Sequence, residues 1–237
     1  MNKEIFKNTI IERFSKYGLI LSSKNIDEFY NYMKNLCDWN SKINLTAIKN
    51  EEEIIVKHFL DSSIIIKYFS KGKILDVGAG AGLPGIPLKI MNKDLEVTLL
   101  DSVNKKVNFM KDSIEKLELS NTVAIHGRAE DFAHEKKYRE KFDIVVSRAV
   151  SNMSTLAEYM IPFVKVGGKC ICMKGPSIES ELQEAKNAIK KLGGEIVDVV
   201  KYNVENNERT LIIILKKKNT EQTYPRKQGK PLKEPIK

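Results

Sequence analysis

The residues whose types and spacing could perform chemistry gather at one glycine-rich turn, K-I-L-D-V-G-A-G-A-G-L-P-G-I-P-L, at positions 73–88. Gly78, Gly80 and Gly82 spell G-x-G-x-G. With Gly85, the last two also spell G-x-G-x-x-G, the fingerprint of dinucleotide-binding proteins. Glycines after a strand let the backbone turn sharply and approach a ligand with no Cβ in the way. Because ligands of open α/β sheets bind beyond the carboxyl ends of the strands, the turn predicts a nucleotide-binding site.

Acids near the ends of three successive predicted strands favour a methyl donor over a dinucleotide at this turn. Asp76 lies two residues before Gly78, where a carboxylate repels a pyrophosphate and attracts a sulfonium or an ammonium group. Asp101 ends the second strand and can accept both hydroxyls of an adenosine ribose, which both kinds of cofactor carry. Glu130 and Asp131 follow the third strand, within reach of an adenine amino group. The pattern predicts S-adenosylmethionine, although each acid alone could be a helix cap or a solvated loop residue.

Two kinds of hydrophobic pattern divide the chain into regions that must position this turn. Residues 1–70 have helical periodicity, with helices predicted over 25–39 and 51–69. From residue 73 onward short apolar strands alternate with helices, which predicts a mostly parallel sheet covered on both faces. The predicted strands cover 73–77, 95–101, 122–126, 142–147, 169–174, 195–200 and 209–215. The last two have no helix between them, so we expect an antiparallel hairpin at one edge of the sheet.

These patterns predict a helical extension over 1–70, an α/β domain over 71–218 and a tail over 219–237. The net charge is +9, and residues 216–237 contribute +6 of it through eight lysines and arginines against two glutamates. Three prolines and little apolar content predict that the tail is flexible. A basic tail usually binds a polyanion, and a solvated end without function is the alternative.

The composition is that of an ordinary globular protein of 237 residues, with 42% hydrophobic residues and a mean hydropathy of −0.32. No apolar run approaches the roughly 20 residues of a membrane span, and the N-terminus lacks the apolar segment of a signal peptide. We therefore expect a cytoplasmic protein without membrane contact. No long apolar stripe requires a partner subunit, which favours a monomer. Cys170 and Cys172 alternate in a strand, which favours two core positions over a metal or redox pair.

Six motifs, in order along nearly the whole chain, resemble the RsmG family, also called GidB. They are W-N-x-x-x-N-L-T-A-I, H-F-L-D-S, L-D-V-G-A-G-A-G-L-P-G-I-P-L, G-R-A-E-D, V-V-S-R-A-V and Y-P-R-K. The resemblance implies a class I S-adenosylmethionine-dependent methyltransferase, with a Rossmann-like, mostly parallel seven-stranded sheet and an N-terminal helical extension. It also implies the substrate, N7 of a guanine in 16S ribosomal RNA (guanine 527 in the 530 loop), within the RNA or the small ribosomal subunit.

The resemblance also implies which residues contact S-adenosylmethionine. These residues lie in the glycine turn and after the third and fourth strands: Gly78, Leu83, Ala129, Glu130 and Arg148. Gly80 belongs to the same turn, and Asp101 is added by the ribose argument. No metal site is expected.

Guanine N7 carries a free in-plane lone pair, so it can attack a methyl sulfonium without first losing a proton. A general base is therefore unnecessary, in agreement with three widely spaced histidines that form no evident triad. Arg148, just past the fourth strand, is the residue expected to position the base, since a guanidinium can bind guanine O6 or a phosphate. The alternative for Arg148 is an ion pair with Asp143 or Glu130 that braces the pocket.

Candidates for contact with RNA lie in the helical extension, at the end of the fifth strand and in the tail: Asn44, Lys174, Tyr224, Arg226 and Lys227. The three in the tail can combine stacking with charge, the usual means of holding looped RNA. Lys174 could meet a backbone phosphate. Asn44 and His58 lie in family-like motifs, with a helix cap and a helix-packing imidazole as their structural alternatives.

Three other classes of protein are possible from the residues alone. An NAD-dependent oxidoreductase would use the G-x-G-x-x-G pattern, but it also needs a constellation such as Tyr-x-x-x-Lys or a His with an Asp near the nicotinamide, and none follows the glycine turn. A small-molecule methyltransferase would need neither the basic tail nor the helical extension. A non-catalytic RNA-binding module would have no use for an intact cofactor pocket.

Overall fold

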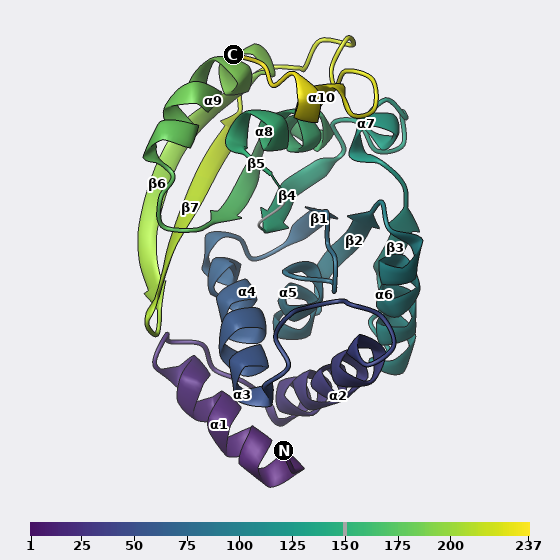
Figure 1. The fold of residues 1–237 in the computed structure, drawn as a ribbon, viewed down its shortest axis with the longest axis vertical. Helices are drawn as coiled ribbons and strands as arrows, with labels where there is room; N and C mark the ends of the chain where they lie inside the picture. The colour runs from purple at the N-terminus through teal and green to yellow at the C-terminus, as the bar shows by residue number, and fades with distance from the viewer. Residues whose placement is uncertain (149–150) are drawn as a thin grey trace.

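A seven-stranded sheet occupies the centre of the molecule and carries helices on both faces (Figure 1). The structure is a computed structural model that describes residues 1–148 and 151–237, so Ala149 and Val150 of the V-V-S-R-A-V motif lie outside the described residues. The strand order is β3-β2-β1-β4-β5-β7-β6. The strands are Gly72–Val77 (β1), Leu95–Asp101 (β2), Thr122–His126 (β3), Phe142–Arg148 (β4), Val164–Lys174 (β5), Gly194–Val204 (β6) and Asn207–Lys216 (β7).

The direction of the last strand distinguishes one side of the sheet from the other. β1 to β5 pair in parallel, whereas β7 runs antiparallel to both β5 and β6. β7 enters between β5 and β6, which leaves β6 at the edge. The predicted parallel sheet with a terminal antiparallel hairpin is confirmed.

One face of the sheet is covered by the N-terminal helices together with the helices that follow β1 and β2. These helices are α1 (Lys3–Ser15), α2 (Ser23–Asn40), α5 (Gly85–Met91) and α6 (Asn104–Lys116). A capping box between Ser22 and Asn25 fixes the start of α2, whose apolar face packs into a core with Phe29, Tyr32 and Phe59. The buried hydroxyl of Tyr32 donates to the carbonyl of Ala81 in the glycine turn. The helical extension is thereby attached to the strand ends where the site is expected.

The other face is covered by helices from the second half of the chain. They are α7 (Ala129–Phe132), α8 (Met153–Met160), a 3-10 turn (Ile161–Phe163), α9 (Glu179–Lys191) and the short α10 (Lys230–Lys233). Cys170 and Cys172 are both buried under this layer, and the thiol of Cys172 lies 3.6 Å from the sulfur of Met160. Burial raises the pKa of Cys172 to about 12, so this thiol is inert. The prediction of two core positions is confirmed.

The predicted helix over 51–69 is one helical run with a change of winding in the middle. It comprises α3 (Glu51–Ile54), a π-helical segment (Ile55–Leu60), α4 (Asp61–Ser63) and a 3-10 segment (Ile64–Tyr68). Asn50 caps its start by accepting from the amide of Glu53 at 3.0 Å. The π-helical turn holds an extra residue, and such turns are frequent at functional sites. Here it carries His58, and Asp61 follows it directly.

The structure corrects the expectation of a flexible tail over 219–237. Tyr224, Pro231 and Ile236 are buried against the layer of α7, α8 and α9. The guanidinium of Arg139 donates to the carbonyls of Thr220, Glu221 and Tyr224 at 2.7–3.0 Å. Low apolar content suggested disorder, but buried polar partners on the domain satisfy the backbone of this segment and hold it in place.

Candidate functional site

The glycine turn after β1 has the backbone that its sequence requires. Gly78, Gly80 and Gly82 have φ angles of 71°, 61° and 77°, in the left-handed region that favours glycine. A Cβ added at Gly80 would find no atom closer than 3.9 Å, so this residue faces open space where a ligand can approach. A Cβ at Gly85 would lie 2.3 Å from the Cδ2 of Leu99, so this glycine serves the packing of α5 on β2.

Two of the predicted acids hold the turn from either side. Asp101 accepts from the amide of Gly80 at 2.8 Å through one oxygen and from the amide of Val103 at 2.8 Å through the other. Asp76 is fully buried and accepts from the amide of Gly85 at 2.8 Å, while its Oδ1 has no partner among the described residues. Burial raises the pKa of Asp76 to about 7. A buried carboxylate with one unsatisfied oxygen favours a positive charge beside the turn.

Two cavities meet at the turn and share Gly78, Asp101 and Ser102 as walls. The first, of about 210 Å³, extends beyond β3 along Ala129 and Glu130. The second, of about 410 Å³, extends along the turn, and its other lining residues include Leu83, Lys106, Thr46, His58 and Arg148. The two adjoining cavities are together lined by every cofactor residue predicted from the sequence.

The smaller cavity has a polar wall and an apolar wall. Glu130 is buried, and it accepts from the amide of Gly229 in the C-terminal segment at 2.9 Å. Tyr159 lies beside it, and burial together with the charge of Glu130 raises the pKa of this phenol to about 12. Asp131, the neighbouring acid, is exposed and does not line the cavity. Leu232, which the sequence did not indicate as a site residue, completes the wall from the C-terminal segment.

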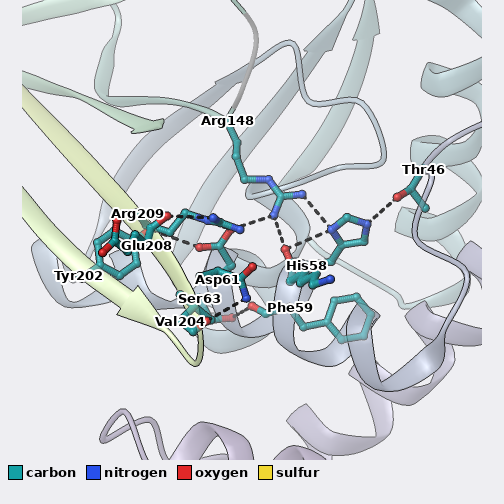
Figure 2. A network of polar contacts seen from close by, with 12 residues as sticks. Thr46, His58, Phe59, Asp61, Ser63, Arg148, Tyr202, Val204, Glu208 and Arg209 are labelled. Atoms are coloured by element: carbon teal, nitrogen blue, oxygen red, sulfur yellow. Dashed lines mark hydrogen bonds and ion pairs between the residues drawn. The ribbon is translucent and has the colours of Figure 1, made fainter. Parts of the chain in front are cut away.

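Arg148 ends β4 and lines the larger cavity. Its side chain reaches the π-helical segment (Figure 2). Its Nη1 donates to the carbonyl of Lys57 at 2.9 Å and lies 3.5 Å from a carboxylate oxygen of Asp61. Its Nη2 lies 3.2 Å from the Nδ1 of His58. The side chain of Arg148 is therefore held in place, as its structural alternative expects, but by residues of the H-F-L-D-S motif and the residue before it.

The partners expected for Arg148 in its structural role, Asp143 and Glu130, bond elsewhere. Asp143 accepts from the amide of Lys73 at 2.7 Å and pairs with the ammonium of Lys165. The structural alternative for Arg148 is therefore wrong about its partners. They come from the helical run over 51–68 and not from β4 or the residues that follow β3.

His58 is a neutral imidazole with both ring nitrogens engaged. Nδ1 lies 3.2 Å from both the Nη2 of Arg148 and the carbonyl oxygen of Lys57, and because a guanidinium can only donate we assign Nδ1 as the acceptor, which places the hydrogen on Nε2. That hydrogen is donated to the hydroxyl of Thr46, at 2.7 Å. Burial, with the nearby charge of Arg148, lowers the pKa of His58 to about 4. The histidine thus positions Arg148 and is not a free base.

Asp61 joins this network to the edge hairpin (Figure 2). It is 3% exposed, and it receives the hydroxyl of Tyr202 at 3.3 Å and the Nε of Arg209 at 3.4 Å. Burial beside this carboxylate raises the pKa of Tyr202 well above its ordinary value. Asp61 and Thr46 were not singled out from the sequence, although the H-F-L-D-S and N-L-T-A-I motifs contain them.

Most of the residues proposed for RNA contact are occupied within the protein. Lys174 donates to the carbonyl of Ser151 and to Glu181, both at 2.6 Å. Tyr224 is buried between the C-terminal segment, to which it belongs, and the helical layer, with the ammonium of Lys191 5.6 Å from its ring centre. Neither side chain is placed to meet a nucleotide.

Three further candidates differ in their exposure. Arg226 binds Glu158 with both carboxylate oxygens engaged, whereas Lys227 is exposed. Asn44 is exposed and lines a separate cavity of about 400 Å³ beside Thr46. The helix that follows Asn44 is capped by Asn50 instead, and the loop between the two helices is held by Asn40, whose side chain accepts from the amides of residues 45 and 46 at 2.9 Å.

The residues that the structure describes contain no group of three or more His, Cys, Asp or Glu side chains that could hold a metal ion. In the same part of the chain, no helix is long and apolar enough to cross a membrane.

The strand order, the glycine turn after β1 and the acid at the end of β2 define a Rossmann-like methyltransferase fold. Solved structures with this fold include a ribosomal protein L11 methylase from Lactobacillus delbrueckii subsp. bulgaricus, with a TM-score of 0.53 and 12% identity over 68% of this chain and 79% of that one. A SAM-dependent methyltransferase from Aquifex aeolicus has a TM-score of 0.52 and 18% identity, over 68% and 93% of the two chains. The predicted fold class is confirmed.

More particularly, the chain belongs to the GidB family, rRNA small subunit methyltransferase G, whose model matches residues 25–212. A "Ribosomal RNA small subunit methyltransferase G" from Clostridium botulinum (strain Eklund 17B / Type B) is 49% identical over 93% of this chain and 94% of its own. One from Clostridium novyi (strain NT) is 45% identical over the whole of both chains. The resemblance read from the six motifs is confirmed.

Proposed function

We propose that the protein transfers the methyl group of S-adenosylmethionine to N7 of a guanine in small-subunit ribosomal RNA, with guanine 527 as the expected target. The observation that carries this proposal is the state of the polar groups in the larger cavity. The imidazole of His58 has both nitrogens engaged, and the oxygens of Asp101 accept two backbone amides. Among the described residues that line this cavity, the one histidine is already engaged through both ring nitrogens, and such a site suits an acceptor that loses no proton before attack.

The methyl donor is S-adenosylmethionine, which supplies a methyl group activated by a sulfonium charge. The residues present fit it. Gly80 leaves space for close approach, Asp101 has lone pairs for ribose hydroxyls, and the unsatisfied oxygen of Asp76 favours positive charge. Ala129 and Glu130 line the smaller cavity, where an adenine ring fits.

Arg148 is the residue we assign to orient the base. Of its five N–H bonds, three point to Lys57, His58 and Asp61 within the described chain, which leaves two for a ligand. A guanidinium fixed on three sides presents those donors in a constant direction, as recognition of guanine O6 requires. Holding the base in line with the methyl group can supply about 7–11 kcal/mol of the barrier reduction.

The proposal is tested by methyl transfer from labelled S-adenosylmethionine to small subunits and to naked 16S RNA from cells that lack this gene. Reductive chain cleavage then locates N7 marks. We expect one mark at the family's guanine, in one or both substrates. Confirmed cofactor binding without label in either RNA would contradict the proposal and favour a small-molecule acceptor.

A matched pair of variants tests the assignment of Arg148. Arg148→Lys keeps the positive charge beside Asp61 but loses the fixed pair of donors, so we expect kcat to fall about 100-fold or more, as for the loss of one oriented donor. Arg13→Lys, in the ion pair of α1 with Glu205, should leave kcat unchanged. Equal kcat in the two variants would refute the assignment.

A further inference from the structure

The C-terminal residues 220–236, here called the C-terminal clasp, are held on the domain by a series of polar side chains, most of them buried. Arg139 fixes the first part of the clasp through three carbonyls. The Nε2 of His134 donates to the carbonyl of Pro225 at 2.8 Å, and the hydroxyl of Thr155 donates to the carbonyl of Pro231 at 2.9 Å. These contacts place the clasp across α7 and α8, beside the smaller cavity.

An ion pair fastens the middle of the clasp. Glu158 of α8 is fully buried, and its two oxygens accept from the backbone amide, Nε and Nη2 of Arg226 at 2.7–3.2 Å. A buried carboxylate that lost this partner would be left without compensation, so the pair disfavours release of the clasp. Arg226, expected from the sequence to bind RNA, acts within the protein as a latch.

Beyond the latch, the clasp reaches the cofactor cavity itself. The amide of Gly229 donates to Glu130 at 2.9 Å and so fixes a carboxylate that lines the smaller cavity. Leu232 follows in α10, and its side chain is 60% exposed while it lines the same cavity opposite the strand ends. An exposed leucine at the mouth of a cavity is apolar surface that a flat ring can cover.

We propose that the C-terminal clasp is part of the cofactor site, with Leu232 packing on the adenine ring and Gly229 holding Glu130 in place. This inference rests on the proposed function, because it takes the adenine end of S-adenosylmethionine to lie in the smaller cavity. The chemistry agrees, since the cavity combines an apolar wall from Leu232 with a polar wall from Glu130 and Tyr159. Adenine likewise has apolar faces and a polar edge.

The first test measures binding of S-adenosylhomocysteine and of adenosine to the full-length protein by calorimetry. Leu232→Ala should weaken both ligands about fivefold, the loss expected for part of a leucine side chain leaving water on binding. Leu232→Met should restore the affinity. Ile20→Ala, which shortens a side chain that is 89% exposed and away from both cavities, should change nothing.

The second test needs no substitution. Hydrogen exchange of the wild-type chain should slow in the peptide 226–236 when S-adenosylhomocysteine is added. The ligand covers α10 and stabilises the hydrogen bond from the amide of Gly229 to Glu130. Unchanged exchange there, or equal affinities for wild type and Leu232→Ala, would overturn the inference. A wild-type chain that binds no S-adenosylhomocysteine would instead contradict the proposed function.

Discussion

The neutral imidazole of His58 should make the folded protein sensitive to acid in a way that one substitution removes. Burial lowers the pKa of His58 to about 4 in the folded state, against 6.5 for an ordinary histidine. Between these values the unfolded chain binds the proton and the folded chain does not. The contribution of His58 to stability is therefore present above pH 6.5 and is lost as the pH falls toward 4.

The size of the effect follows from the two pKa values. At 1.36 kcal/mol per pKa unit, the full loss is about 3 kcal/mol, of which about 2 kcal/mol is reached at pH 5.0. At pH 7.5 the loss is close to zero. His58→Gln cannot take up this proton, although it also loses the hydrogen bonds to Thr46 and Arg148 at every pH.

Urea unfolding at pH 7.5 and pH 5.0 measures the prediction. The difference in the free energy of unfolding between wild type and His58→Gln should shrink by about 2 kcal/mol at the lower pH. Other groups that titrate in this range affect both proteins and cancel in the difference. Ile20→Ala, which shortens an exposed side chain without a titratable group, is the control and should differ from wild type equally at both pH values. A difference that is the same at both pH values would refute the neutral, buried state of His58.

Other predictions follow from the turn and the clasp. Because the pKa of Asp76 is about 7 and only its ionised form attracts a positive charge, S-adenosylmethionine should bind up to about tenfold tighter at pH 8 than at pH 6. Calorimetry of Asp76→Asn should show that this pH dependence is gone. Gly85→Ala, whose Cβ would collide with Leu99, should lower the free energy of unfolding by about 1–3 kcal/mol. Gly175→Ala, with no atom within 4 Å, should change it by less than about 0.5 kcal/mol. Glu158→Gln removes the buried charge beneath the C-terminal clasp, so limited trypsin digestion should cleave that segment about tenfold faster than in wild type. An unchanged rate would show that the latch does not hold the clasp.

The strands and the glycine turn could be predicted because their signals are local. The apolar run that ends at Asp101 indicates a buried strand without any knowledge of its neighbours. Cys170 and Cys172 are two residues apart in a strand, so both side chains lie on the same face of the sheet. The predicted cofactor residues were chosen from these elements, since the ends of neighbouring parallel strands meet at one edge of the sheet.

The partners of Arg148 could not be predicted in the same way. Whether His58 and Asp61 face the end of β4 depends on the π-helical turn, because one extra residue in a turn rotates all later side chains about the helix axis. Helical periodicity alone does not reveal such a turn. The contact also joins residues about ninety positions apart, and no local pattern specifies it.

The tail was misjudged for a different reason. Its composition predicted disorder, but its order comes from residues elsewhere in the chain, chiefly Arg139 and Glu158. A buried arginine and a buried glutamate look like surface residues in a sequence, since both types are mostly exposed in proteins. The positive charge of Arg226 is consequently neutralised within the fold.

The position of the clasp in the chain has a consequence for the order of folding. Gly229 lies 99 positions after Glu130 in the sequence, yet the two residues meet beside the smaller cavity. Closing so long a loop costs more conformational entropy than pairing strands that follow one another in the chain. The smaller cavity is therefore complete only when segments from distant parts of the sequence have come together.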